Sequence, residues 1–146
     1  MTPNVVELVA VLACTLFTGA AVYVNAVEHP ARLSCGTEIA ATQWAPSYKR
    51  ATVMQASLAV LAALFGAIRA VQGGGELWMW AAALIFAVVP FTLIVVQPLN
   101  NRLLDSQRDR RSAETLALLK SWGHLHAVRS VLGFTASVLF VWAAAR

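Results

Sequence analysis

The apolar residues of the chain fall into four long blocks that are separated by short polar stretches. Each block is about as long as the roughly 20 residues that a helix needs to cross the hydrocarbon layer of a bilayer. Backbone groups in hydrocarbon must find their hydrogen bonds within their own segment, so each block is predicted to be a helix. We therefore expect an all-α fold, an integral membrane four-helix bundle formed by one domain of residues 1–146. The four spans are expected at about residues 5–28, 49–70, 76–98 and 122–145.

The composition also indicates a membrane protein. Hydrophobic residues make up 59% of the chain and charged residues 12%, which is roughly half the charge of an ordinary soluble domain. The formal net charge of +4 comes from basic residues that flank the apolar blocks. Aromatic residues do not alternate with these basic residues as they do in RNA-binding motifs. We therefore expect the lipid bilayer as a partner and no nucleic acid.

The distribution of Lys and Arg predicts how the spans are oriented. The loops after the first and third spans, with their flanks, hold eight basic residues, and the opposite side holds two. Such an excess marks the cytoplasmic side of a membrane, so both termini of this multi-pass protein are expected on the non-cytoplasmic side. The eight residues are Arg32, Lys49, Arg50, Arg102, Arg108, Arg110, Arg111 and Lys120, and the two are Arg69 and Arg146.

The two cysteines are expected to be free thiols. Cys14 lies inside the first span and Cys35 in the loop that follows it. A helix over residues 14–27 rises about 20 Å, at about 1.5 Å per residue, whereas a disulfide needs Cα atoms within about 7 Å of each other. The pair also lacks the CxxC spacing of a metal or redox site.

Polar residues collect at one end of the predicted bundle. The first and third spans end on the side where the second and fourth begin, and we call this end of the bundle the polar end. An ionisable residue within a span is costly and is by default a hypothesis for a functional site. The polar set consists of Asn25, Glu28 and His29 in the first span, Tyr48, Lys49, Arg50 and Gln55 in the second, Gln97, Asn100 and Asn101 in the third, and Trp122, His126 and Arg129 in the fourth.

The fourth span places one of its two histidines inside the bundle. Trp122, His126 and Arg129 recur at i, i+4 and i+7, so they share one helix face. His124 lies about 200° around the helix from His126 and is expected to face solvent or headgroups. Arg129 either extends to the membrane interface or forms an ion pair with Glu28. In a purely structural alternative, the polar set is interhelical glue that fixes the helix register.

Two local signals concern the connections between spans. Ser112 is expected to cap a short surface helix over residues 113–121. Pro30 favours an end of the first helix at His29, since the residue before a proline avoids helical geometry.

Four motifs carry a resemblance to a known family. They are FTGAAVYVNAVEHPAR, WAPSYKRATVMQ, PFTLIVVQPLNNRLL and WGHLHAVRSVLG, which cover most of the chain. In these motifs the chain resembles a family of small four-span membrane proteins, classed as a domain of unknown function, that includes the fungal anthrone oxygenases. The resemblance is to the bacterial branch, which implies the bacterial inner (cytoplasmic) membrane. The residues carried over are Asn25, Glu28, His29, Asn101, His126 and Arg129.

The resemblance implies an oxygenase that acts on a flat, lipid-soluble phenolic or anthrone-type substrate in a pocket at the polar end. Carbanions of such compounds can react with oxygen without a cofactor, so the site needs a base and hydrogen-bond donors for the oxyanion. A histidine would be the base, oriented by the carboxylate, and the guanidinium and amides would hold the enolate. The expected catalytic residues are His126, His29, Glu28 and Arg129, and the expected substrate-binding residues are Asn25, Asn101 and Trp122.

Two further interpretations stay open. Glu28, His29 and His126 form a carboxylate–histidine set that suits iron, copper or zinc, and haem is a related alternative. Glu28 and His29 diverge by about 100° on a helix, so both ligate one metal only if the helix ends there. The expected cofactor is therefore none, a metal or haem. The other interpretation is a non-enzymatic accessory subunit of a membrane complex, and a homo-oligomer or a membrane partner is compatible with each of these functions.

Overall fold

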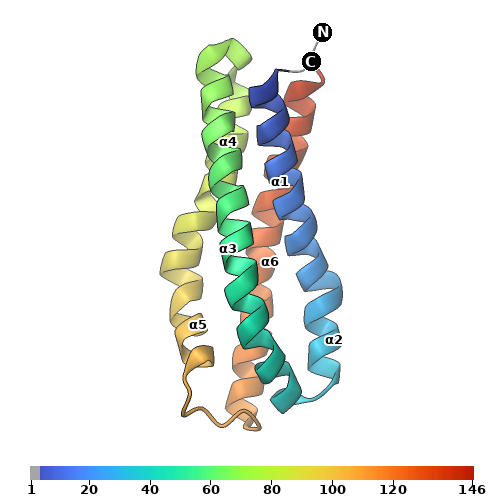
Figure 1. Cartoon of the computed structure of the whole chain (residues 1–146), viewed down its shortest axis with the longest axis vertical. Helices are drawn as coiled ribbons and strands as arrows, with labels where there is room; N and C mark the ends of the chain where they lie inside the picture. The colour runs from blue at the N-terminus through green and yellow to red at the C-terminus, as the bar shows by residue number, and fades with distance from the viewer. Residues whose placement is uncertain (1–3) are drawn as a thin grey trace.

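Four long helical rods, arranged up and down, form the molecule (Figure 1). The computed structural model describes residues 4–146, which are helical almost throughout and contain no strand. The all-α bundle expected from the hydropathy pattern is confirmed. The elements in chain order are α1 (Val5–Tyr23), η1 (Val24–Glu28), α2 (His29–Ser34), α3 (Thr37–Arg69), η2 (Ala70–Gly74), α4 (Glu76–Phe91), η3 (Thr92–Val96), α5 (Gln97–Leu104) and α6 (Ala113–Ala144), where η marks a π-helical turn.

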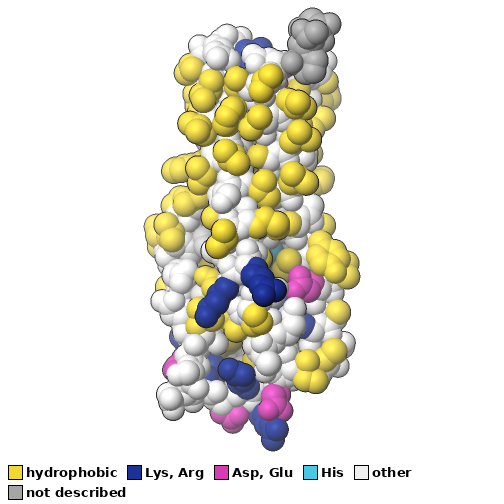
Figure 2. All heavy atoms as spheres, in the orientation of Figure 1, with side chains coloured by type: hydrophobic (Ala, Val, Ile, Leu, Met, Phe, Trp, Pro, Cys, Tyr) yellow, Lys and Arg dark blue, Asp and Glu magenta, His cyan; other side chains and the backbone are white. Residues whose placement is uncertain are grey.

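The π-helical turns η1 and η3 join neighbouring helices into continuous rods, and η2 ends the second rod at Gly74. Each of the four rods is long and apolar enough to cross a membrane, which makes the chain a multi-pass membrane protein. Apolar side chains cover the upper part of the face in Figure 2, and charged side chains gather toward the lower end. This lower end, which holds α2 and α5, is the polar end. The rods run over Val5–Ser34, Thr37–Gly74, Glu76–Leu104 and Ala113–Ala144.

The rods are longer than the hydrocarbon layer is thick. Residues 50 and 69 of α3 are both arginines, and the helix between them rises about 29 Å at about 1.5 Å per residue. This rise matches the roughly 30 Å of hydrocarbon in a bilayer. The part of the polar end beyond Arg50 therefore extends past the hydrocarbon into the headgroup region.

The bundle has two hydrophobic cores. The core in the apolar part is rich in alanine, and small residues let the helices approach closely. At Gly133 a Cβ atom would lie only 2.7 Å from the ring of Phe17. Cys14 is buried in this core and Cys35 is exposed, and both are free thiols, as expected. The second core lies at the polar end and contains Val24, Ala40, Trp44, Val96, Leu119 and Trp122.

Two π-helical turns carry the first and third rods past a proline. Pro30 is the second residue of α2, directly after η1, and Pro98 is the second residue of α5, directly after η3. In η1 the N–H of His29 donates to the carbonyl of Val24, five residues earlier. Proline lacks an N–H and disturbs an α-helix, and the wider turn accommodates it. The expected end of the first helix at Pro30 is therefore wrong, because the rod continues to Ser34.

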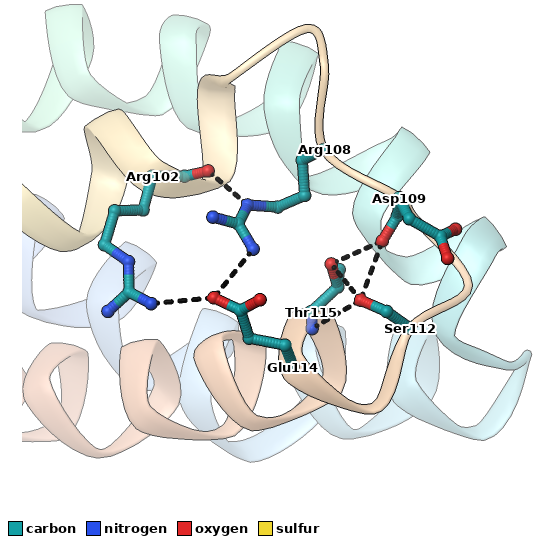
Figure 3. Close-up of polar contacts among 6 residues, drawn as sticks. All are labelled: Arg102, Arg108, Asp109, Ser112, Glu114 and Thr115. Carbon is teal, nitrogen blue, oxygen red and sulfur yellow. Dashed lines mark hydrogen bonds and ion pairs between the residues drawn. The ribbon is translucent and has the colours of Figure 1, made fainter.

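A network of polar side chains closes the loop between α5 and α6 at the polar end (Figure 3). Arg102 and Arg108 both contact Glu114, at 2.8 and 3.2 Å. Ser112 caps α6, because its Oγ accepts a hydrogen bond from the backbone N–H of Thr115 at 3.1 Å. The predicted cap is confirmed. The helix that begins there is not a separate surface helix, however, but continues without a break into the fourth span.

Candidate functional site

The residues expected to form one site lie in different places in the structure. His126 and Arg129 are buried in the bundle, and Asn25 contacts His126 from the first rod. Glu28 is partly exposed and faces the start of α3. Asn101 is exposed on α5, where its Oδ1 accepts a hydrogen bond from Nε2 of Gln97 at 2.9 Å. Only the first three residues therefore form an interior polar cluster.

Asn25 fixes the tautomer of His126. The Nδ2 of Asn25 donates to the carbonyl of Gly123 at 2.9 Å, so its Oδ1 faces the imidazole, 2.7 Å from Nδ1 of His126. An amide oxygen only accepts hydrogen bonds, so Nδ1 carries the proton and Nε2 keeps its lone pair. Ser130 donates to the same amide oxygen at 2.6 Å. No group within residues 4–146 forms a hydrogen bond with Nε2, so this nitrogen is free to accept a proton.

The π-helical turn η1 brings Asn25 against α6. Asn25 is the second residue of this turn. The extra residue in a π turn rotates the following residues by about 100° relative to a regular α-helix, and such single turns are frequent at functional sites. On the facing rod, His126 is 2% exposed and His124 is exposed, as their spacing predicts. Local backbone geometry thus selects which side chains meet.

Arg129 is buried among neutral groups. Its Nη2 donates to Oε1 of Gln55 at 3.0 Å, and its guanidinium lies 5.9 Å from the centre of the Phe17 ring. Neither alternative predicted for Arg129 is found: its side chain is buried rather than extended to the interface, and it forms no ion pair with Glu28. Glu28 instead pairs with Arg32, four residues along the same rod, because an i,i+4 partner is always within reach. The sequence signal for Gln55 is a single amide within the apolar stretch of the second span.

A cavity of about 110 Å³ lies beside Arg129, between α3 and the third rod. We call it the lipid-side cavity, because Ala56 and Leu93 in its wall are exposed on the outer surface of the bundle. Its surface is mainly apolar, and its polar lining residues are Thr52, Gln55, Thr92, Gln97 and Arg129. Gln55 and Arg129 are bonded to each other. Binding sites for small apolar molecules have this character, a mainly apolar wall with a few convergent polar groups.

A second cavity, of about 20 Å³, adjoins the first, and we call it the inner cavity. Thr52, Gln55 and Arg129 line both cavities, so Arg129 stands at their junction. His126 and Trp122 line the inner cavity and do not line the lipid-side cavity. The guanidinium therefore borders both cavities, and the imidazole borders only the inner one.

His29 is a packing residue of the polar end. Its Nε2 donates to the carbonyl of Leu119 at 2.9 Å, which leaves Nδ1 as the unprotonated nitrogen, and this atom is buried without a partner in the described part of the chain. The ring lies against Gly123, where a Cβ atom would be 2.7 Å from Cδ2 of His29. His29 lines neither the lipid-side nor the inner cavity. The geometry therefore favours His126 over His29 as a base.

Trp122 supports the imidazole of His126 from one side. Its ring centroid lies 4.8 Å from that of His126 and 5.1 Å from that of His29. Trp44 packs edge-on against it at 5.7 Å. Trp122 is thus a buried member of the second core that also lines the inner cavity.

Glu28, His29 and His126 do not converge as metal ligands would. The Oε1 of Glu28 accepts hydrogen bonds from Ser47 at 2.9 Å and Gln43 at 3.1 Å, in addition to its contact with Arg32. Across residues 4–146 no three His, Cys, Asp or Glu side chains are grouped to hold a metal ion. The structure therefore gives no support to the carboxylate–histidine metal site that the sequence suggests.

Sequence reasoning missed two residues of the interior cluster. From the sequence, Arg32 counts only as one of the basic residues that set the orientation, and in the structure its side chain is buried and lines the inner cavity. Ser130 follows His126 by four residues, so the same face of α6 carries both. That spacing is the signal from which Ser130 could have been found.

Comparison with known proteins agrees with the resemblance. A family model described as anthrone oxygenase matches residues 44–139. An anthrone oxygenase of Aspergillus fumigatus is 30% identical over 147 residues, which cover 92% of this chain and 90% of the relative. An anthrone oxygenase of Claviceps purpurea is 27% identical over 151 residues, which cover 94% of this chain and 87% of the relative.

No solved structure matches the chain. Both relatives are fungal, so placement in a bacterial branch stays a prediction. The family match includes Gln55, His126 and Arg129, and the two relatives extend the similarity over almost the whole length. The chain therefore belongs to the anthrone oxygenase family.

Proposed function

We propose that the chain is a membrane oxygenase that accepts a flat, lipid-soluble phenolic or anthrone-type substrate in the lipid-side cavity. The observation that supports this most directly is the junction of the two cavities, where Arg129 borders both and His126 borders the inner one. A substrate oxygen at the junction would meet a cation. The acidic C–H group of the same substrate would have to extend past Arg129 toward the inner cavity to meet Nε2 of His126.

In this mechanism the Nε2 of His126 removes a proton from the carbon that is activated by the substrate's carbonyl or phenol. The guanidinium of Arg129 stabilises the enolate oxygen, as a preorganised donor does for a developing oxyanion. The carbanion then adds to dioxygen and takes up the proton as a hydroperoxide. Loss of water leaves a new carbonyl, so one CH₂ group and one O₂ give one C=O group and one H₂O. Asn25 acts through His126, by holding the imidazole in the required tautomer.

The wall of the lipid-side cavity supports entry from the membrane. Leu93 is 63% exposed on η3, and Ala56 is exposed on α3 opposite to it. Both belong to the part of the rods that lies on the hydrocarbon side of Arg50. An apolar substrate would therefore pass from the lipid into the cavity without crossing water.

The proposal includes the orientation of the bundle, with the polar end at the cytoplasmic face. The support is the excess of Lys and Arg on the loops of that end. Reporter fusions at the N- and C-termini test it, because both reporters should be active only on the non-cytoplasmic side. A terminal reporter that is active in the cytoplasm would contradict this orientation.

The function is tested by oxygen uptake and quinone absorbance with an anthrone, using the purified protein in nanodiscs. Empty nanodiscs correct for the slow oxidation of the substrate alone. His126→Gln and Arg129→Gln should each lower the rate by about 100-fold or more, whereas His124→Gln, on the exposed face of α6, should retain it. Wild-type uptake equal to that of empty nanodiscs would contradict the proposal.

Absorption spectra and metal content of the same samples test the role of the base. The proposed mechanism predicts full activity in a colourless protein with less than one metal per chain. A Soret band or one bound metal per chain that is lost in His126→Gln would assign the oxygen chemistry to that group instead. Melting temperatures of all variants show whether a loss of activity reflects unfolding.

A further inference from the structure

The hydroxyl of Thr52 has no hydrogen-bond partner in the bundle. Thr52 lies on α3, two residues to the hydrocarbon side of Arg50, and it lines both the lipid-side and the inner cavity. Its Oγ1 forms no hydrogen bond with any group among residues 4–146. At this depth water is scarce, and a polar group without a partner is unfavourable. The hydroxyl is therefore suited to a molecule that enters the cavities.

Other hydroxyl groups on the rods are satisfied by the backbone of their own helix. Those of Ser57 and Thr92 donate to the carbonyl four residues earlier, at 2.8 and 2.7 Å. Those of Thr15 and Thr135 do the same, both at 2.9 Å. Thr92 lines the lipid-side cavity as Thr52 does, so a place in the cavity wall does not by itself prevent this bond. The free hydroxyl is a specific property of Thr52.

The oxygen of Thr52 is also open to a ligand. Six buried side-chain atoms of residues 4–146 lack a partner and are closed to water, and Oγ1 of the half-buried Thr52 is not one of them. The amide nitrogen of Gln55 is likewise without a partner and is not closed. Gln55 is 2% exposed and lines both cavities, so its amide nitrogen opens into them and not onto the outer surface.

Thr52 and Gln55 extend the polar surface that begins at Arg129. They are three residues apart on α3, so they share one face of the helix. Nη2 of Arg129 donates to Oε1 of Gln55 at 3.0 Å, and an amide oxygen only accepts, so the free end of this amide is its N–H₂ donor. All three residues line both cavities. The junction thus presents a cation, an amide donor and a hydroxyl beside one another.

This arrangement exceeds what one substrate oxygen requires. The guanidinium of Arg129 is enough to hold the oxygen that becomes an enolate, which leaves the donors of α3 for a second oxygen. A ring hydroxyl next to a carbonyl gives its own proton to that carbonyl, and its oxygen then needs a donor from outside. The hydroxyl of Thr52 can supply this hydrogen bond.

We propose that Thr52 is a specificity-determining residue, whose hydroxyl donates to a ring oxygen beside the oxygen held by Arg129. The proposal rests on the function proposed above, because it takes the lipid-side cavity as the substrate site. An aromatic ketone with a hydroxyl on the adjacent ring position pairs with Thr52. A ketone without this hydroxyl leaves Thr52 without a partner and binds less well.

Two unreactive ring ketones test the pairing without turnover. They are 1-hydroxyanthraquinone and anthraquinone, which lack the acidic C–H group of an anthrone. Binding is the ligand retained by protein-loaded nanodiscs above that retained by empty ones, and affinity is expressed per mole fraction of ligand in the lipid. The wild-type protein should bind the hydroxylated compound about tenfold more tightly, the effect of one hydrogen bond. Equal affinities for the two compounds would overturn the proposal.

Thr52→Val assigns the preference to one hydroxyl. Valine has nearly the same shape and no hydroxyl, so the ratio of the two affinities should fall close to one. Thr92→Val is the matched control, because the hydroxyl that it removes is already bonded to the carbonyl of Val88. It should change both affinities by the same factor and keep the wild-type ratio. A wild-type ratio in Thr52→Val, or equal falls in both variants, would overturn the role of Thr52.

Oxygen uptake with anthrone and with 1,8-dihydroxyanthrone separates this inference from the proposed function. Thr52→Val should lower the preference in kcat/KM for the hydroxylated anthrone by about tenfold. A protein that binds the ketones with the expected ratios and oxidises neither anthrone would contradict the oxygenase function and support the role of Thr52. A protein that oxidises both anthrones while Thr52→Val keeps the wild-type ratios would support the function and overturn the role of Thr52.

Discussion

The Oδ1 of Asn25 accepts a hydrogen bond from Nδ1 of His126 at 2.7 Å, across 101 positions of the sequence. The contact joins the π-helical turn of the first rod to the middle of α6. It determines which imidazole nitrogen is protonated. The chemistry of the fourth span thus depends on an amide in the first.

The first prediction concerns this amide. Asn25→Ala should lower kcat/KM for an anthrone by about 10–100-fold, because the imidazole loses the acceptor that fixes its tautomer. The matched control is Asn101→Ala, which removes an exposed amide of the same polar end and should change the rate less than twofold. Oxygen uptake and melting temperature are measured on both. Equal losses in the two variants would contradict a specific role for Asn25.

The second prediction concerns the close contact between α6 and His29. A Cβ atom at Gly123 would lie 2.7 Å from Cδ2 and 2.8 Å from Nε2 of His29. Gly123→Ala should therefore destabilise the protein by about 1–3 kcal/mol, as overpacking does. In a His29→Ala background, Gly123→Ala should lower the free energy of unfolding much less. A double-mutant cycle measures this coupling between the two residues.

Gly19→Ala is the control for helix propensity in that experiment. A Cβ atom at Gly19 meets nothing within 4 Å, so the substitution should be neutral or stabilise by up to about 1 kcal/mol. Unfolding by SDS in mixed micelles gives both free energies. A Gly123→Ala protein as stable as Gly19→Ala would show that the two rods separate more easily than the contact implies.

The third prediction compares the two partners of one ion pair. The side chain of Arg32 is 4% exposed and that of Glu28 is 24% exposed. Glu28→Gln leaves a buried cation without its carboxylate and should destabilise by about 2–4 kcal/mol. Arg32→Gln leaves a partly solvated carboxylate that still accepts hydrogen bonds from Ser47 and Gln43. Arg32→Gln should therefore lower the free energy of unfolding by less than Glu28→Gln. The same SDS titration measures both, and the reverse order would contradict this account.

The fourth prediction concerns the route into the lipid-side cavity. Ala56→Leu adds bulk at the exposed wall of the cavity and should raise the KM for an anthrone by about tenfold. Ala83→Leu adds the same group to the lipid face of α4, outside this cavity, and should leave the KM unchanged. Steady-state kinetics in nanodiscs distinguish the two. An equal rise in KM in both variants would indicate a general effect of added bulk on the lipid-facing surface and would contradict a blocked entrance.

The sequence predicted the four rods because spanning a bilayer imposes length and hydropathy on each segment independently. It also predicted the cap at Ser112 and the opposite exposures of His124 and His126, which depend on local spacing. These features need no knowledge of how the helices face one another. They can therefore be predicted from a single amino-acid sequence.

The pairings between rods were harder to predict, because they depend on helix rotation. The π-helical turn η1 adds a residue to the turn before Pro30, and no sequence pattern predicts this extra residue. The helix consequently continues, Arg32 becomes a buried side chain, and Glu28 pairs locally instead of reaching Arg129. Arg129 then takes Gln55 as its partner.

Because Arg129 borders both cavities, the proposed reaction would take its substrates from one side and release its products on the other. The lipid-side cavity faces the hydrocarbon, where an apolar ring compound and dioxygen both dissolve well. The inner cavity leads toward Arg32 and Ser47 at the headgroup level, where a proton and a water molecule are readily released. An oxygenase built in this way acts as a phase-transfer catalyst. Its rate should follow the mole fraction of substrate in the membrane rather than its concentration in water.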